Sequence, residues 1–146
     1  MKKILFIYVY CCCFTIIFGF ANIQTIYAHA QSQDTQSLKE NTKIAINDNY
    51  YFKYTFPEKI KIGNSVIKIS IFDKNDKKVD TLKIIGSYDM PSMRGNHSFI
   101  NQTFQKNKNS DYLLPLNLVM RGEWEIILII QENNENIYNG AILFKV

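Results

Sequence analysis

The sequence has few of the residues that build catalytic and cofactor sites. It contains two histidines, and its three cysteines are adjacent, at Cys11, Cys12 and Cys13. Without residues 1–30, the chain has no cysteine and a single histidine, His97. A Ser–His–Asp or Cys–His arrangement is therefore hard to build. The six glycines are dispersed and form no phosphate-binding loop. We predict that the protein is not an enzyme.

Positive charge is not concentrated in any part of the chain. The formal net charge is +4, and the densest basic group, Lys74, Lys77 and Lys78, is interleaved with aspartates. This mixture is typical of a solvated turn. It predicts no surface for binding nucleic acid.

The N-terminus has the order of a secretory signal peptide. Lys2 and Lys3 precede an uncharged apolar run at residues 4–20, and Ala28-His29-Ala30 offers small residues at the two positions that signal peptidase reads. We therefore expect residues 1–30 to be a signal peptide and the protein to be periplasmic or otherwise extracytoplasmic. The alternative is a membrane anchor formed by residues 4–20, since an apolar run of about 17 residues lies at the lower limit for spanning a bilayer.

After the signal, short alternating segments predict strands. Residues 31–49 are polar and are expected to be a flexible lead-in. Strands are predicted at residues 50–56, 66–72, 79–87, 97–104, 112–119, 123–131 and 137–146. Polar turns that recur about every 8–12 residues are typical of an antiparallel sandwich. We predict one all-β domain at residues 50–146, an antiparallel β-sandwich of about seven strands.

Two of these strands separate their residues onto distinct faces. In the strand 66–72, one face carries Ile67, Ile69 and Ile71. In the strand 123–131, one face carries Trp124, Ile126, Leu128 and Ile130. Glu123 and Glu125 lie on the opposite face of that strand and are expected to face solvent.

One group of residues has the chemistry of a metal site. Met90, Met93 and His97 lie within eight residues, and Met120 is the only other methionine after the signal. If the strands run up and down in sequence order, all four fall at one end of the sandwich. Thioether sulfur and imidazole suit Cu(I), so these four residues are the candidate copper ligands, and Trp124 would shield the site or pack beneath it. Alternatively, the methionines fill gaps at the end of the core.

The order of several motifs resembles the YtkA-like domain. The motifs are Tyr50 to Phe56, Ile62-Gly63-Asn64, Val66 to Asp73, Met90-Pro91-Ser92-Met93 with His97, Asp111-Tyr112, and Met120-x-Gly122-x-Trp124. The resemblance covers residues 50–146. A more distant similarity relates the chain to FixH-type proteins, which share the methionine-proline loop and the glycine-tryptophan strand. The resemblance implies an immunoglobulin-like β-sandwich on the outer side of the cytoplasmic membrane, in proteins that accompany copper handling or cytochrome oxidase assembly.

The loop before Trp124 departs from the family pattern. Family loops commonly read methionine-proline-glycine, whereas this chain has Met120-Arg121-Gly122. Arg121 places a positive charge beside the candidate ligands. That charge would disfavour a bound cation if the guanidinium pointed inward.

Two functions are compatible with these features. The first is a periplasmic, non-enzymatic binding or accessory protein that handles Cu(I) through the Met/His site, with a copper-transfer protein or a membrane respiratory complex as partner. The second is a metal-free interaction module, which assists assembly of a membrane respiratory complex through the same loop end or an edge strand. In both cases we take the domain to be a monomer.

We predict that the exported protein begins at Gln31, because Ala28-His29-Ala30 is the cleavage motif. The intact mass of the protein recovered from outside the cytoplasm measures this directly. A protein that still begins at Met1 would identify residues 4–20 as an anchor.

Overall fold

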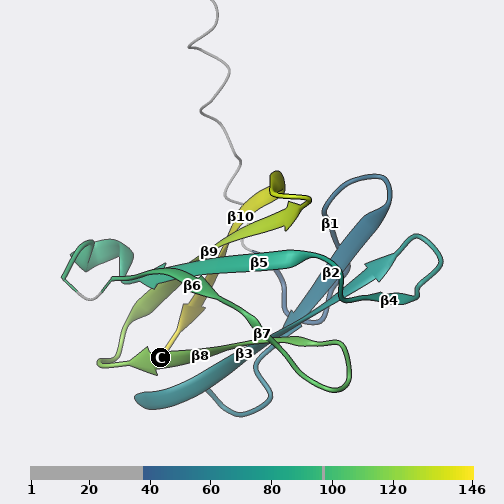
Figure 1. Cartoon of the computed structure of the whole chain (residues 1–146). Helices are drawn as coiled ribbons and strands as arrows, with labels where there is room; N and C mark the ends of the chain where they lie inside the picture. Colours follow the sequence, from purple (N-terminus) through teal and green to yellow (C-terminus); the bar gives the residue numbers. More distant parts are fainter. Residues whose placement is uncertain (1–37, 97) are drawn as a thin grey trace, which may run out of the picture. The chain divides into compact units, whose positions relative to one another are not determined.

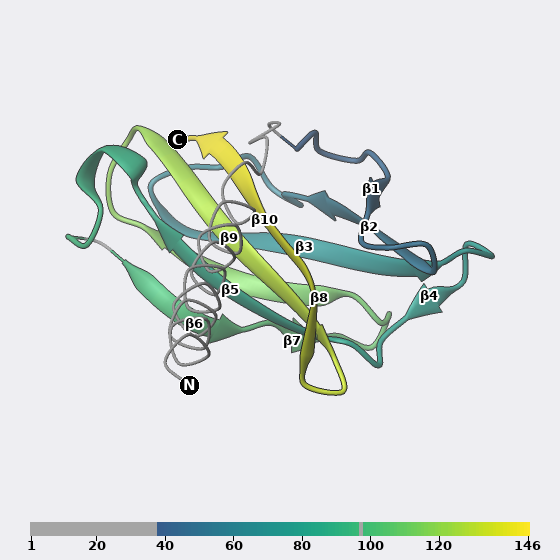
Figure 2. The same cartoon turned by 90° about the horizontal axis from the view of Figure 1, so that it is seen from above.

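Two antiparallel sheets pack against each other in the computed structural model, which describes residues 38–96 and 98–146 (Figure 1). Sheet A has the strand order β1 (Ile44–Ala45), β2 (Tyr50–Thr55), β3 (Gly63–Asp73), β8 (Tyr112–Leu118) and β7 (Gln105–Lys106), and β4 (Lys78–Val79) pairs with β3. Sheet B has the order β10 (Glu135–Lys145), β9 (Glu123–Glu132), β5 (Lys83–Asp89) and β6 (Phe99–Thr103). In Figure 2, β5 and β9 run obliquely across β3 and β8. The predicted all-β sandwich is confirmed.

The core lies between the sheets and takes every second residue of the central strands. The fully buried side chains of β3 and β9 are Ile67, Ile69, Ile71, Trp124, Ile126, Leu128 and Ile130. Each buried side chain of this size contributes about 1.5–3 kcal/mol. All buried hydrophobic residues that the structure describes lie between Phe52 and Ile142. The core of the residues that the structure describes therefore lies within the compact unit Thr35–Val146.

The strand predicted at residues 79–87 is in fact two strands in different sheets. Val79 of β4 pairs with Ile71 in sheet A, and β5 begins at Lys83 in sheet B. Between them the chain bends, and the buried side chain of Leu82 enters the core. The apolar pattern continues through the bend, because both strands face the same core from opposite sides. The sequence pattern therefore does not reveal that the chain passes from one sheet to the other.

The stretch predicted as a lead-in, residues 31–49, is described from Leu38 onward. Its strand β1 pairs with β2, and the Tyr54 hydroxyl donates a hydrogen bond of 2.6 Å to the Leu38 carbonyl. The described part of this stretch is thus attached to sheet A. The predicted signal peptide, residues 1–30, lies outside the described residues. Among the residues that the structure describes, no helix has the length and apolar character needed to cross a membrane.

Asp111, just before β8, is a buried carboxylate that joins three strands. Its Oδ1 accepts hydrogen bonds from the Ser70 hydroxyl at 2.6 Å and from the Lys78 ammonium at 2.5 Å, and the Asn107 amide lies 3.5 Å from Oδ2. Burial raises the pKa of this carboxyl, but the hydrogen bonds from Lys78 and Ser70 outweigh burial, so the pKa of Asp111 lies below its usual value. The network connects β3 and β4 to the start of β8.

We predict that Asp111→Ala lowers the free energy of unfolding at neutral pH by about 1–3 kcal/mol, because Ser70 and Lys78 lose their acceptor. The pKa of Asp111 is lower in the folded than in the unfolded protein. Its contribution is therefore complete above the unfolded pKa and is lost as the pH falls through the folded pKa. The difference between wild type and variant should shrink in that acidic window. Urea unfolding at a series of pH values measures both effects.

The matched control is Asp76→Asn, which removes the charge of an exposed aspartate that pairs with Lys43 at 2.8 Å and keeps a residue type that tolerates the φ of 60° at this position. Its effect on unfolding should be smaller, because exposed ion pairs contribute little. An equal loss for both variants, or a loss for Asp111→Ala that does not change with pH, would contradict the assigned role of Asp111.

Candidate metal site

The loop between β5 and β6 is shaped by the carboxylate of Asp89. Its Oδ1 accepts the Met90 N–H at 2.7 Å, and its Oδ2 accepts the Gly95 N–H at 2.9 Å and the Ser98 hydroxyl. The hydrogen bonds from Ser98 and then Gly95 hold the pKa of Asp89 below its usual value. Inside the loop, Pro91–Met93 forms a 3₁₀ turn, η1, closed by a 2.9 Å hydrogen bond from the Met93 N–H to the Met90 carbonyl. The methionine-proline segment is therefore held in shape by hydrogen bonds of its own loop.

Arg94 fastens this loop to the outer face of sheet B. Its Nη2 lies 2.9 Å from Oε2 of Glu125 on β9, and the Glu125 side chain is only 12% exposed. The prediction that Glu125 faces solvent is therefore wrong. Its carboxylate does point away from the core, but the Arg94 side chain covers it. Glu123, on the same face, is exposed as predicted.

The two methionine-bearing loops meet at one end of the sandwich. The Cε of Met90 lies so close to Gly122 that a Cβ on this glycine would stand 2.6 Å from it. Gly122 also has a φ of 143°, where other residues are strained. The Met120 carbonyl accepts a hydrogen bond of 3.2 Å from the indole N–H of Trp124. Met90, Met120 and Trp124 thus belong to one local arrangement, although 34 positions separate the first from the last.

The predicted ligands differ in the solvent exposure of their side chains. Met90 is 4% exposed, while Met93 and Met120 are half-buried and pack against the core. His97 lies outside the described residues. Arg121 is exposed, so its charge is directed to solvent and not into the core.

The two loops at this end carry three thioether side chains, those of Met90, Met93 and Met120. Within residues 38–96 and 98–146, no three His, Cys, Asp or Glu side chains come together in a group able to hold a metal ion. Sulfur ligands of this kind select Cu(I) over hard cations such as Mg²⁺ and Ca²⁺. The donor chemistry of Met90, Met93 and Met120 therefore fits Cu(I).

An aromatic layer lies beneath the methionine end. Trp124 is fully buried, and its ring centroid lies 6.3 Å from that of Tyr88, which in turn stacks on Phe99 at 4.5 Å. The Tyr88 hydroxyl accepts a 3.0 Å hydrogen bond from the backbone N–H of Asn117. Trp124 is predicted from the sequence to pack beneath the site. Tyr88 and Phe99 are not, because their pairing depends on the register of β5 and β6.

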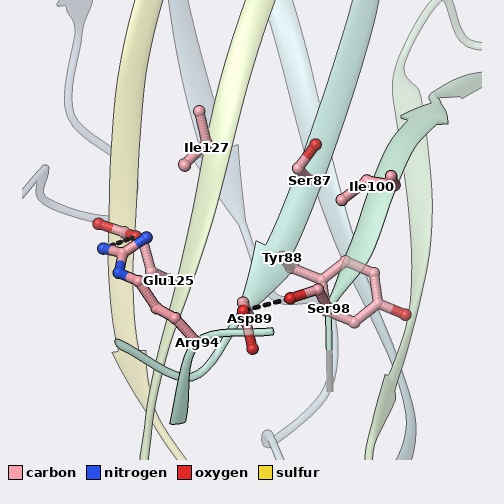
Figure 3. Close-up of a pocket in the computed structure, with 8 residues that line it drawn as sticks. All are labelled: Ser87, Tyr88, Asp89, Arg94, Ser98, Ile100, Glu125 and Ile127. Atoms are coloured by element: carbon pink, nitrogen blue, oxygen red, sulfur yellow. Dashed lines mark hydrogen bonds and ion pairs between the residues drawn. The ribbon is translucent and has the colours of Figure 1, made fainter. Parts of the chain in front are cut away.

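A hollow of about 180 Å³ opens beside the loop on the outer face of sheet B (Figure 3). It is lined by Ser87, Tyr88, Asp89, Arg94, Ser98, Ile100, Glu125 and Ile127. The charged side chains in it bond to one another or to the loop, as the dashed lines in Figure 3 show for two pairs. Asp89 is not among the site residues predicted from the sequence. Its position directly before Met90-Pro91 was a usable signal, because aspartate side chains commonly accept hydrogen bonds from backbone groups in turns.

The family model described as YtkA-like matches residues 44–128, more than half of the chain, and spans both methionine-bearing loops. The chain belongs to the YtkA-like family. No curated protein and no solved structure matches it significantly. Neither comparison tests the more distant similarity of this YtkA-like protein to FixH-type proteins. The immunoglobulin-like form of the sandwich likewise stays a prediction.

We predict that the contact between Met90 and Gly122 is measurable by a double-mutant cycle. Gly122→Ala should destabilise the protein by about 1–3 kcal/mol, because the new methyl meets the Met90 Cε and alanine is strained at this φ. Met90→Ala should cost about 2–5 kcal/mol by emptying buried space. In the double variant the clash is absent, so the total loss should be smaller than the sum by at least about 0.5 kcal/mol. Urea unfolding gives all four free energies.

Gly63 provides the control for backbone strain. It has a φ of 98°, and a Cβ there would meet no atom within 4 Å. Gly63→Ala should therefore combine additively with Met90→Ala. If Gly122→Ala were equally additive, the two loops would not be in contact.

Proposed function

We propose that this YtkA-like protein is an extracytoplasmic, non-enzymatic accessory protein that holds Cu(I) at its methionine end. The observation that carries the proposal is the meeting of the Met90 and Met120 loops above Trp124. Two segments that each bring thioether sulfur are held together by the fold. Cu(I) is the biological cation for which such ligands are best suited.

The surroundings of the methionines favour a soft monovalent cation. Met93 and Met120 are half-buried, and Met90 lies at the edge of the core, so a bound ion would be largely shielded from water. Thioethers are neutral, so they do not compensate the charge of the ion. Asp89 at the base of the loop stays ionised because its pKa is lowered, and its negative charge favours a nearby cation. His97 is the fourth predicted ligand.

The loop that carries Met90 and Met93 is held by hydrogen bonds and an ion pair within the domain. The hydrogen bonds to Asp89 and the Arg94–Glu125 ion pair fix both of its ends. A pre-organised site loses less conformational entropy on binding. This supports a role in holding or passing on copper, for which a copper-transfer protein is the proposed partner.

We predict that the domain of residues 31–146 binds one Cu(I) per chain in competition with a chromophoric Cu(I) chelator. The Met90→Leu/Met120→Leu variant should lose affinity at least about 100-fold, since even changes to groups that only support a ligand can cost 10–100-fold. Leucine conserves the volume of methionine, so the fold should survive. Circular dichroism and the free energy of unfolding check that it does.

The matched control is Leu82→Met, a substitution of the same size in the core at the opposite end of β5. Copper affinity should not change in this variant. Unchanged affinity in the Met90→Leu/Met120→Leu protein would refute the copper site.

A metal-free interaction module is the second candidate, and the burial of Met90 favours it specifically. A methionine that is 4% exposed and packs against Gly122 fills a gap as core methionines do. In this case the methionine end, or an edge strand, would contact a membrane respiratory complex during assembly. Wild-type protein that binds no copper above the competitor would support this function, as would a partner complex that the Met→Leu variant still captures.

A further inference from the structure

Strand β9 is apolar on both of its faces. Residues 126–130 read Ile-Ile-Leu-Ile-Ile without interruption. Ile126, Leu128 and Ile130 point inward and are fully buried, so Ile127 and Ile129 point outward. The outward face of an antiparallel sandwich normally alternates to polar residues, and an unbroken apolar run is typical of a strand covered on both sides. The sequence of β9 therefore indicates that something packs on the outside of sheet B.

The neighbouring strands extend this apolar surface. The register places Ala141 of β10 and Ser87 of β5 beside Ile127, and Ile85 of β5 beside Ile129. Figure 3 shows Ile127, Ser87 and Ile100 on the same side of three strands. We call this surface the isoleucine face, formed by Ile85, Ile100, Ile127, Ile129, Ala141 and Leu143. Within the described part of the chain, Ile100 stays 66% exposed and Ile127 and Leu143 stay 37% exposed.

Charge is distributed in opposite senses at the two ends of the isoleucine face. Asp89 and Glu125 are paired neighbours at the methionine end. Arg94 pairs with Glu125 there, so the two carboxylates and the one guanidinium leave a net negative charge at this end. Lys83, paired with Gln131, lies at the other end of β5. The outward residues of β5 thus run from a cation through Ile85 to an anion. A second copy laid face to face with its strands reversed brings Lys83 of each copy to the acidic end of the other, while the apolar centres coincide.

We propose that the isoleucine face is the interface of a homodimer, in which two copies pack sheet B on sheet B about a twofold axis. This goes beyond the copper proposal and replaces the monomer expected from the sequence. A twofold interface must be self-complementary, and the reversed-strand arrangement meets that requirement in both charge and apolarity. An anionic membrane surface fits less well, because the net negative charge of Asp89, Glu125 and Arg94 would face it. The reversed strands also place the two methionine ends at opposite ends of the dimer, where both stay accessible.

Sedimentation equilibrium of residues 31–146 over a wide concentration range tests the interface. The wild-type protein should be a dimer, and Ile127→Lys should weaken dimerisation at least about tenfold, because it places a charge at the centre of an apolar interface. Leu143→Lys should act in the same direction. The matched control is Val66→Lys, at a position that is 38% exposed on the outer face of sheet A. This variant should dimerise like the wild type.

The charge pattern gives an independent test. Lys83→Glu would meet the acidic end of the second copy and should weaken dimerisation several-fold, whereas Lys68→Glu, on the outer face of sheet A, should not. All five substitutions lie outside the core, and circular dichroism verifies their fold. A wild-type protein that stays monomeric at every concentration would overturn the proposal, whether or not it binds anionic vesicles. Equal effects of Ile127→Lys and Val66→Lys would overturn it too.

Discussion

The sandwich depends on contact between two rows of apolar side chains from different sheets. Ile67, Ile69 and Ile71 of β3 form one row, and the inward residues of β9, beginning with Trp124, form the other. Because side chains alternate along a strand, a slip of one residue in either strand would turn its whole row outward. The free energy lost by exposing a whole apolar row to water fixes the register of both sheets. The register in turn determines which loops meet at each end of the domain.

At the methionine end, this register brings together chemistry that the chain keeps far apart. Trp124 opens the inward row of β9, and its indole holds the Met120 carbonyl. Asp89 closes β5 beside Glu125, so Met90 follows at the same level and packs against Gly122. The proposed copper site is therefore a consequence of strand pairing. The same pairing produces the outer isoleucine face, because inward and outward residues of β9 are fixed together.

Two aspartates organise the ends of the domain in similar ways. Asp89 accepts hydrogen bonds from its own loop, and Asp111 accepts them from Ser70 and Lys78 on other strands. In both cases the donors lower the pKa of the carboxyl. Each carboxylate thereby stays ionised at neutral pH and replaces the water that its donors would otherwise bind. A single acceptor with several donors can order a loop that contains few apolar residues.

The sequence by itself determined the class of fold and the inner faces of its strands. Period-two patterns such as Ile67, Ile69 and Ile71 are local, and burial follows from them directly. Only the tertiary structure decided that the segment 79–87 divides between two sheets, that Arg94 covers Glu125, and that Met90 reaches Gly122. These features depend on distances between residues far apart in the chain. Such distances are set by sheet pairing and side-chain packing, which no local pattern records.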